Sequence, residues 1–146
     1  GVLPEDGVRP RDDVGEVRVV PHRGQRLVEG RLEAIERLWE AIGRASGADQ
    51  VGFCLDTCHA HAGGNELLGL VDRVKAITGR VDLIHANDSR DPFDSGADRH
   101  ANWGTGHCDP DGVADVLRSA DAPVVIETPG GVPEHVRDLT WLADRL

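Results

Sequence analysis

The segment VGFCLDTCHAHAGG, residues 51–64, gathers several side chains that could do chemistry. Asp56 ends an apolar run, and Cys58, His59 and His61 follow it within five positions. Three interpretations are open: a catalytic thiol, a cysteine-rich zinc knuckle, or a strand end that supplies an aspartate and a histidine to a metal ion. The knuckle is disfavoured because the three cysteines form no CxxC pair.

Further polar side chains of the same kind follow two later apolar runs and a polar loop. His85 ends one run, Glu127 ends another, and Asp98 and His100 are alternate residues of an extended segment, so they point the same way. A mixed set of nitrogen and oxygen ligands suits zinc, with manganese or iron possible. One strand-end histidine alone is more often structural, but six such residues together favour a metal site. The predicted metal ligands are Asp56, His59, His85, Asp98, His100 and Glu127.

The elements that must position these residues alternate along the chain. Short β-branched or apolar runs are typical of buried strands, and apolar residues at helical spacing are typical of amphipathic helices. This alternation predicts an α/β fold of parallel strand–helix units, either half of an eight-fold barrel or a small open sheet, with its chemistry where strands end. Strands are predicted at 17–20, 51–55, 81–86 and 123–128, helices at 29–44, 66–77, 109–120 and 133–146, and a polar loop at 87–107.

Composition limits the partners and the setting of the protein. A net charge of -10 argues mildly against a nucleic-acid partner, although bound cations could reverse this locally. No apolar run is long enough for a membrane span, and three unevenly placed cysteines favour a reducing cytoplasm. The chain starts at Gly1 and contains no methionine, which predicts that it is a piece of a longer protein. Residues 1–15 are predicted to be a disordered tail, and 16–146 a partial barrel domain.

Three stretches together resemble the endonuclease IV family of apurinic/apyrimidinic (AP) endonucleases. They are GFCLDTCHAHAGG, LIHANDSRDPFDSGADRHANWGTGH and VVIETPGG, in order and properly spaced. The resemblance implies a TIM (β/α)8 barrel of the xylose isomerase-like class that carries three zinc ions. It also implies that this chain corresponds to the C-terminal half of that barrel, so that an N-terminal half would be its natural partner.

The resemblance also assigns roles to individual residues. Two zinc sites are expected here, one held by Asp56, His85 and Glu127 and another by His59, Asp98 and His100. Asp56 and Glu127 are the expected catalytic carboxylates, and Arg99, Asn87 and Ser89 the expected DNA contacts. Cys58 lies between ligands without being one, which disfavours the catalytic thiol. The family's third zinc uses two histidines of earlier strands, and Val20 stands where a bridging glutamate is expected.

The implied activity is zinc-dependent DNA repair. A metal-bound hydroxide would hydrolyse the phosphodiester 5′ to an abasic site in double-stranded DNA, as in base excision repair. Two alternatives stay open: a metal-dependent sugar or sugar-phosphate isomerase of the same barrel class, and a non-catalytic zinc-binding fragment.

Overall fold

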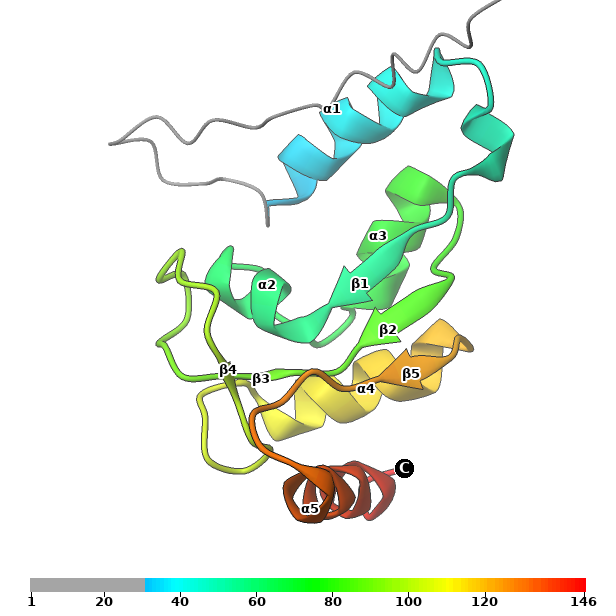
Figure 1. Cartoon of the computed structure of the whole chain (residues 1–146). Helices are drawn as coiled ribbons and strands as arrows, with labels where there is room; N and C mark the ends of the chain where they lie inside the picture. Colours follow the sequence, from blue (N-terminus) through cyan, green and yellow to red (C-terminus); the bar gives the residue numbers. More distant parts are fainter. Residues whose placement is uncertain (1–30) are drawn as a thin grey trace, which may run out of the picture.

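The computed structural model describes residues 31–146, in which short strands alternate with helices (Figure 1). The predicted tail 1–15 and the predicted strand 17–20 lie outside these residues. In chain order the elements are α1 (Leu32–Gly43), a 3-10 turn η1 (Ala48–Gln50), β1 (Cys54–Asp56), α2 (Thr57–Ala62), α3 (Leu70–Thr78), β2 (Leu83–His85), β3 (Asp88–Ser89), β4 (His100–Ala101), α4 (Pro110–Ala120), β5 (Val124–Val125) and α5 (Val132–Ala143).

The sheet consists of three parallel strands in the order β1-β2-β5. Leu55 pairs with Ile84, which in turn pairs with Val124, and Asp56 pairs with His85. The parallel strand–helix units predicted from the sequence are therefore present. Within residues 31–146 the strands form an open sheet and do not close into a barrel.

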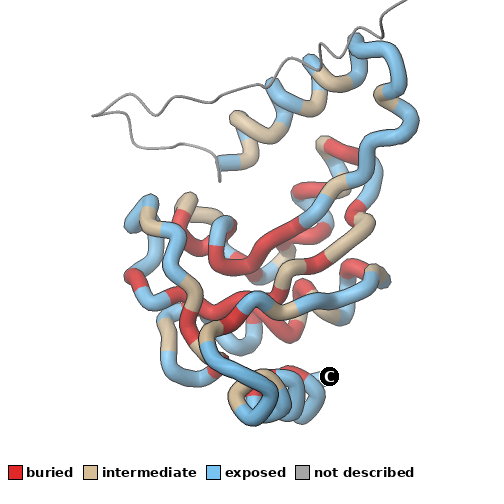
Figure 2. Tube along the Cα trace, viewed as in Figure 1, coloured by how far each residue is buried: buried red, intermediate tan, exposed pale blue. Residues whose placement is uncertain are grey.

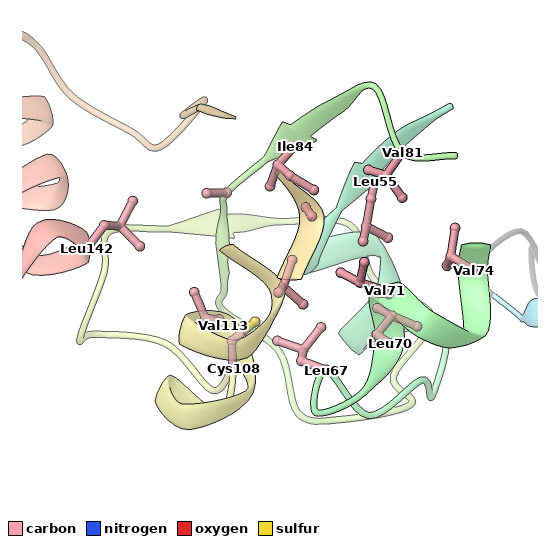
Figure 3. Packing of buried hydrophobic residues seen from close by; sticks show 14 of the residues in the cluster. Leu55, Leu67, Leu70, Val71, Val74, Val81, Ile84, Cys108, Val113 and Leu142 are labelled. Atoms are coloured by element: carbon pink, nitrogen blue, oxygen red, sulfur yellow. The ribbon is translucent and has the colours of Figure 1, made fainter. Parts of the chain in front are cut away.

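The core lies between this sheet and the helices that connect its strands. Leu55 and Ile84 point from the sheet toward Val71 and Leu70 of α3 and Val113 of α4 (Figure 3). Buried residues accordingly gather in β1, at the centre of β2 and on the neighbouring sides of α3 and α4, whereas both residues of β5 are exposed and α1 contains no buried residue (Figure 2). Among the described residues, no helix combines the length and the apolar character that crossing a membrane requires.

Helix boundaries follow the local sequence. The Asp109 carboxylate accepts hydrogen bonds from the N–H groups of Asp111 and Gly112, and Pro110 fills the first turn of α4, where its missing N–H costs nothing. At the other end of a unit, Gly79 closes α3 in the left-handed conformation, with φ 74°. The helix predicted at 109–120 is confirmed, with Asp109 as its cap residue.

Two segments expected to be loops contain regular structure. Residues 57–62 form the short helix α2, because the Asp56 side chain caps it by accepting a hydrogen bond from the His59 N–H at 3.1 Å. Within 87–107, β3 and β4 pair antiparallel, with Asp88 opposite Ala101 and Ser89 opposite His100. This β3–β4 ribbon brings His100 back toward the sheet.

The Asp88 carboxylate stabilises the turn that follows the ribbon. It accepts hydrogen bonds from three backbone N–H groups, of Ser89, Gly106 and Cys108, at 2.8, 2.9 and 3.0 Å. Gly106 passes so close to the Ser89 carbonyl and the Asp88 side chain that any Cβ would clash with them. One buried carboxylate therefore holds both ends of the segment that contains His100.

The core assignment predicts a contrast between two apolar truncations. Ile84 is 0% exposed in the central strand, whereas Leu38 on α1 is 62% exposed. Ile84→Ala should lower the free energy of unfolding by about 2–5 kcal/mol, because it removes buried methyl groups and leaves a cavity. Leu38→Ala should change it by about 0.5 kcal/mol or less. Urea unfolding of both variants measures this, and equal effects would contradict the core described above.

Candidate metal centre

The carboxyl ends of the sheet strands hold the first predicted ligands. β1 ends at Asp56 and β2 at His85, and the parallel register places these two residues side by side. Glu127 follows β5 by two residues, so its side chain lies on the same side of the strand as that of Val125, the partner of His85. The three strands run the same way and end beside α2 and the β3–β4 ribbon (Figure 1).

Asp56, His85 and Glu127 form the first candidate ligand group. His85 Nδ1 lies 3.0 Å from Glu127 Oε2 and 3.7 Å from Asp56 Oδ2. One potential ligand atom from each residue falls within 4.8 Å of the others, a spacing that suits a single cation. Burial decreases across the group, from buried Asp56 through half-buried His85 to exposed Glu127, so the group opens to solvent on one side.

The second group joins α2 to the β3–β4 ribbon. Asp98 lies between two histidines: its Oδ2 is 2.9 Å from His59 Nε2, and its Oδ1 is 3.4 Å from His100 Nε2. Asp56 also takes part, because His59, His100 and Asp56 place ligand atoms within 4.8 Å of one another. The structure therefore brings together all six predicted ligands, in two adjacent groups that share Asp56.

The state of His100 fits a cation. Its Nδ1 lies 3.1 Å from the Glu127 carbonyl oxygen, and because a carbonyl only accepts, Nδ1 carries the proton and donates. Nε2 is buried, forms no hydrogen bond among the described residues, and lies 3.4 Å from Asp98 Oδ1 and 4.0 Å from Asp56 Oδ2. A histidine that donates one ring N–H to a carbonyl and turns its other nitrogen toward carboxylates has the arrangement of a metal ligand.

Cys58 belongs to a third geometric group, with Asp98 and His100. Its side chain is completely buried, and this burial raises the pKa of the thiol to about 11. At neutral pH the thiol is therefore protonated and shielded from solvent, whereas a nucleophilic cysteine requires an accessible thiolate. The geometry disfavours the catalytic thiol.

The residues predicted to contact DNA differ in their exposure. Arg99 is exposed, and its guanidinium pairs with the Asp91 carboxylate, which holds the pKa of Asp91 below its usual range. Asn87 and Ser89 have no exposed surface and form hydrogen bonds inside the protein. In this structure both side chains support the site from within, and their contact with DNA stays a prediction.

Arg90 is a candidate functional residue that sequence reasoning missed. A hollow of about 320 Å³ beside the second ligand group is lined by Arg90, Asp98, Arg99, His100 and Pro129. The Arg90 N–H donates to the Arg99 carbonyl at 2.9 Å, so the two residues pair at the loop end of the β3–β4 ribbon. A prediction that residues 88–89 and 100–101 form paired strands would have placed Arg90 beside the second ligand group.

The sheet, the ligand groups at its carboxyl edge and the comparisons with known proteins agree on the class of protein. A family model described as "Xylose isomerase-like TIM barrel" matches residues 19–145. The chain belongs to this family, which confirms the fold class predicted from the sequence.

Individual relatives show which members of this family the chain is similar to. The chain is 50% identical over 105 residues to a probable endonuclease 4 of Mycobacterium ulcerans and 51% identical to that of Mycobacterium tuberculosis. Each match covers 72% of this chain and 40% of the relative. The crystal structure of endonuclease IV from Thermus thermophilus superposes with a TM-score of 0.64 at 29% identity, covering 79% of this chain and 45% of that one.

These matches confirm the resemblance to endonuclease IV. The chain spans about 40% of the length of the curated relatives it matches. The roles of the individual ligands stay predictions, now supported by their convergence at one edge of the sheet.

The burial of the cysteines predicts an order of chemical modification. Cys54 is exposed, whereas Cys58 and Cys108 are buried, and burial raises the pKa of all three thiols, most strongly for the two buried ones. Because the thiolate is the reactive form, iodoacetamide at about pH 8 should modify Cys54 first and the other two only as the protein unfolds. Peptide mass spectrometry over time measures the order. Fast labelling of Cys58 in folded protein would instead support the interpretation of Cys58 as a catalytic thiol.

Proposed function

We propose that this chain provides the C-terminal half of the barrel of a zinc-dependent AP endonuclease of base excision repair. The substrate would be double-stranded DNA containing an abasic site, cleaved at the phosphodiester 5′ to that site. The observation that supports this most is the convergence of two ligand groups on Asp56 at the carboxyl edge of a parallel sheet. The relatives that carry the name endonuclease 4 support the reaction class.

Each group would hold one divalent cation, with zinc favoured by the histidine-rich set and manganese possible. Bound there, the cations would polarise the phosphodiester and lower the pKa of an attacking water to about 7. The carboxylates Asp56, Asp98 and Glu127 bring three negative charges against four positive charges from two divalent ions. An edge with excess positive charge would then attract a phosphate, although the whole chain has a net charge of -10.

The chain's own residues would bind and orient the substrate. Asp56 and Glu127 would fix the cations against the reacting phosphate, and His59, His85, Asp98 and His100 would complete the ligand groups. Arg90 and Arg99, which line the adjacent hollow, would contact neighbouring DNA phosphates. This arginine pair favours a phosphate-bearing substrate over an uncharged sugar.

Full activity would require the other half of the barrel. The resemblance assigns the ligands of a third zinc to earlier strands, and three-metal catalysis would depend on them. We therefore expect this chain alone to bind cations but to cleave DNA weakly or not at all. That result would agree with the alternative of a non-catalytic zinc-binding fragment. A reducing cytoplasm is the proposed location, supported by three cysteines that are all free thiols.

Cation binding is the first test of the proposed site. Replacing His59 and His100 together by alanine should abolish zinc binding at the second group, measured by calorimetry and by elemental analysis of purified protein. His135→Ala is the matched control, because this half-buried histidine on α5 contacts only the Thr128 carbonyl among the interactions described. Unchanged zinc content in a folded double variant would refute the site.

An abasic duplex, with and without a chelator, tests the reaction on the same protein. Cleavage 5′ to the abasic site that the chelator removes supports a nuclease. Conversion of a ketose to an aldose would support the isomerase, and zinc binding without either reaction would support the non-catalytic reading.

DNA contact by Arg90 is tested separately by affinity. Arg90→Ala should weaken binding of an abasic duplex to zinc-loaded protein and reduce the slope of log K against log salt by about 1, because one phosphate contact is lost. Arg37, exposed on α1, provides the control Arg37→Ala. Fluorescence anisotropy at several salt concentrations measures both. Equal slopes for the two variants would contradict a role for the hollow.

A further inference from the structure

The Asn87 side chain lies completely buried between the two carboxylate strand ends of the candidate site. Its Nδ2 donates to Asp56 Oδ2 at 3.0 Å, and its Oδ1 accepts from the Glu127 backbone N–H at 2.7 Å. Asn87 itself follows His85 by two residues, at the end of β2. A single amide thus connects the ends of all three strands of the sheet.

The Asp56 oxygen that accepts from this amide is also the one that faces a histidine of each ligand group. Asp56 Oδ2 lies 3.7 Å from His85 Nδ1 and 4.0 Å from His100 Nε2, while Oδ1 accepts the capping hydrogen bond from the His59 N–H. Two fixed donors, one on each oxygen, therefore leave the carboxylate a single orientation. Without the Asn87 donor, the carboxylate could rotate away from either histidine.

We propose that Asn87 is a positioning residue that holds Asp56 between the two cation sites and sets the distance of Glu127 from them. The proposal rests on the cation-binding part of the proposed function. Hydrogen-bond partners behind the ligands of a metal typically change its affinity about 10- to 100-fold when they are removed. Because Asp56 belongs to both groups, loss of the Asn87 amide should weaken both sites together.

The anchoring of the backbone at this point is a separate task, carried out by Thr57. Its hydroxyl donates to the Asn87 carbonyl at 2.7 Å and accepts from the Asn87 N–H at 2.9 Å. The main chain of Asn87 is therefore held to α2 independently of the side-chain amide. This division allows the amide to be removed while the backbone contact stays.

The experiment compares Asn87→Ala and Asn87→Leu with a destabilised control. Leucine fills nearly the same space without an amide, so it keeps the proposal testable if the alanine variant unfolds. Thr78→Val is the control, because it removes a buried hydroxyl that bonds to the Val74 and Arg80 carbonyls beside the amino end of β2, away from the ligands. Unfolding in urea ranks the three variants by stability, and only folded samples are titrated.

Titration with Co²⁺ gives affinities and, from its visible absorption bands, a signature of the ligand set. Both Asn87 variants should bind Co²⁺ about 10- to 100-fold more weakly than the unmodified chain, with altered bands. Thr78→Val should keep the affinity and the bands of the unmodified chain despite its lower stability. Affinity that follows stability across all three variants would reduce Asn87 to a structural role and overturn the proposal.

The result for the unmodified chain separates this inference from the proposed function. If the unmodified chain binds no divalent cation, both fail. If it binds cations and the Asn87 variants bind them equally well with the same bands, only the positioning role fails.

Discussion

The parallel register of β1 and β2 is the constraint on which the rest of the site depends. Pairing Asp56 with His85 puts a carboxylate and an imidazole at the same level of one sheet edge. Side chains alternate between the faces of a strand, so a slip of one residue in either strand would turn that strand's ligand to the opposite face. The buried pair Leu55 and Ile84, one residue earlier on each strand, opposes that slip because it would remove one of the two from the core. Core packing and ligand placement are therefore one structural requirement.

Asp56 then determines how the chain continues. Its carboxylate caps α2, and this helix places His59 one turn beyond the strand end, within reach of Asp98. The β3–β4 ribbon approaches from the other side. The Asp88 carboxylate holds the turn after the ribbon by accepting three backbone hydrogen bonds. A buried carboxylate that accepts several N–H groups is well satisfied, which makes it a rigid anchor for a polar loop. The two ligand groups are thus built on short elements whose positions are set by aspartate hydrogen bonds together with apolar packing.

Sequence reasoning found the parts of this arrangement that periodicity encodes. Apolar runs located the strands, helical spacing located α1 and α3, and polar residues at strand ends and in the loops gave the six predicted ligands. It missed α2, which is too short to show a helical period, and the ribbon, which is stabilised by contacts between Asp88 and residues nearly twenty positions away. Asn87 was expected to contact DNA, whereas the structure buries it completely. The sequence could not show this, because burial depends on the folded chain and not on the residue type.

An acidic chain can still carry a site for a polyanion if its charges are arranged unevenly. The carboxylates of the ligand groups lie where cations would neutralise them, and Asp91 is already paired with Arg99. That pairing holds the Arg99 guanidinium on Asp91, and both Arg99 and Arg90 line the hollow beside the ligand groups. Screening in salt confines such effects to about 8–10 Å, so a phosphate at this edge responds to the local charges and not to the net charge of the chain. In the proposed function, the local arrangement of charge around Asp56 and Asp91 would therefore matter more for phosphate binding than the net charge of the chain.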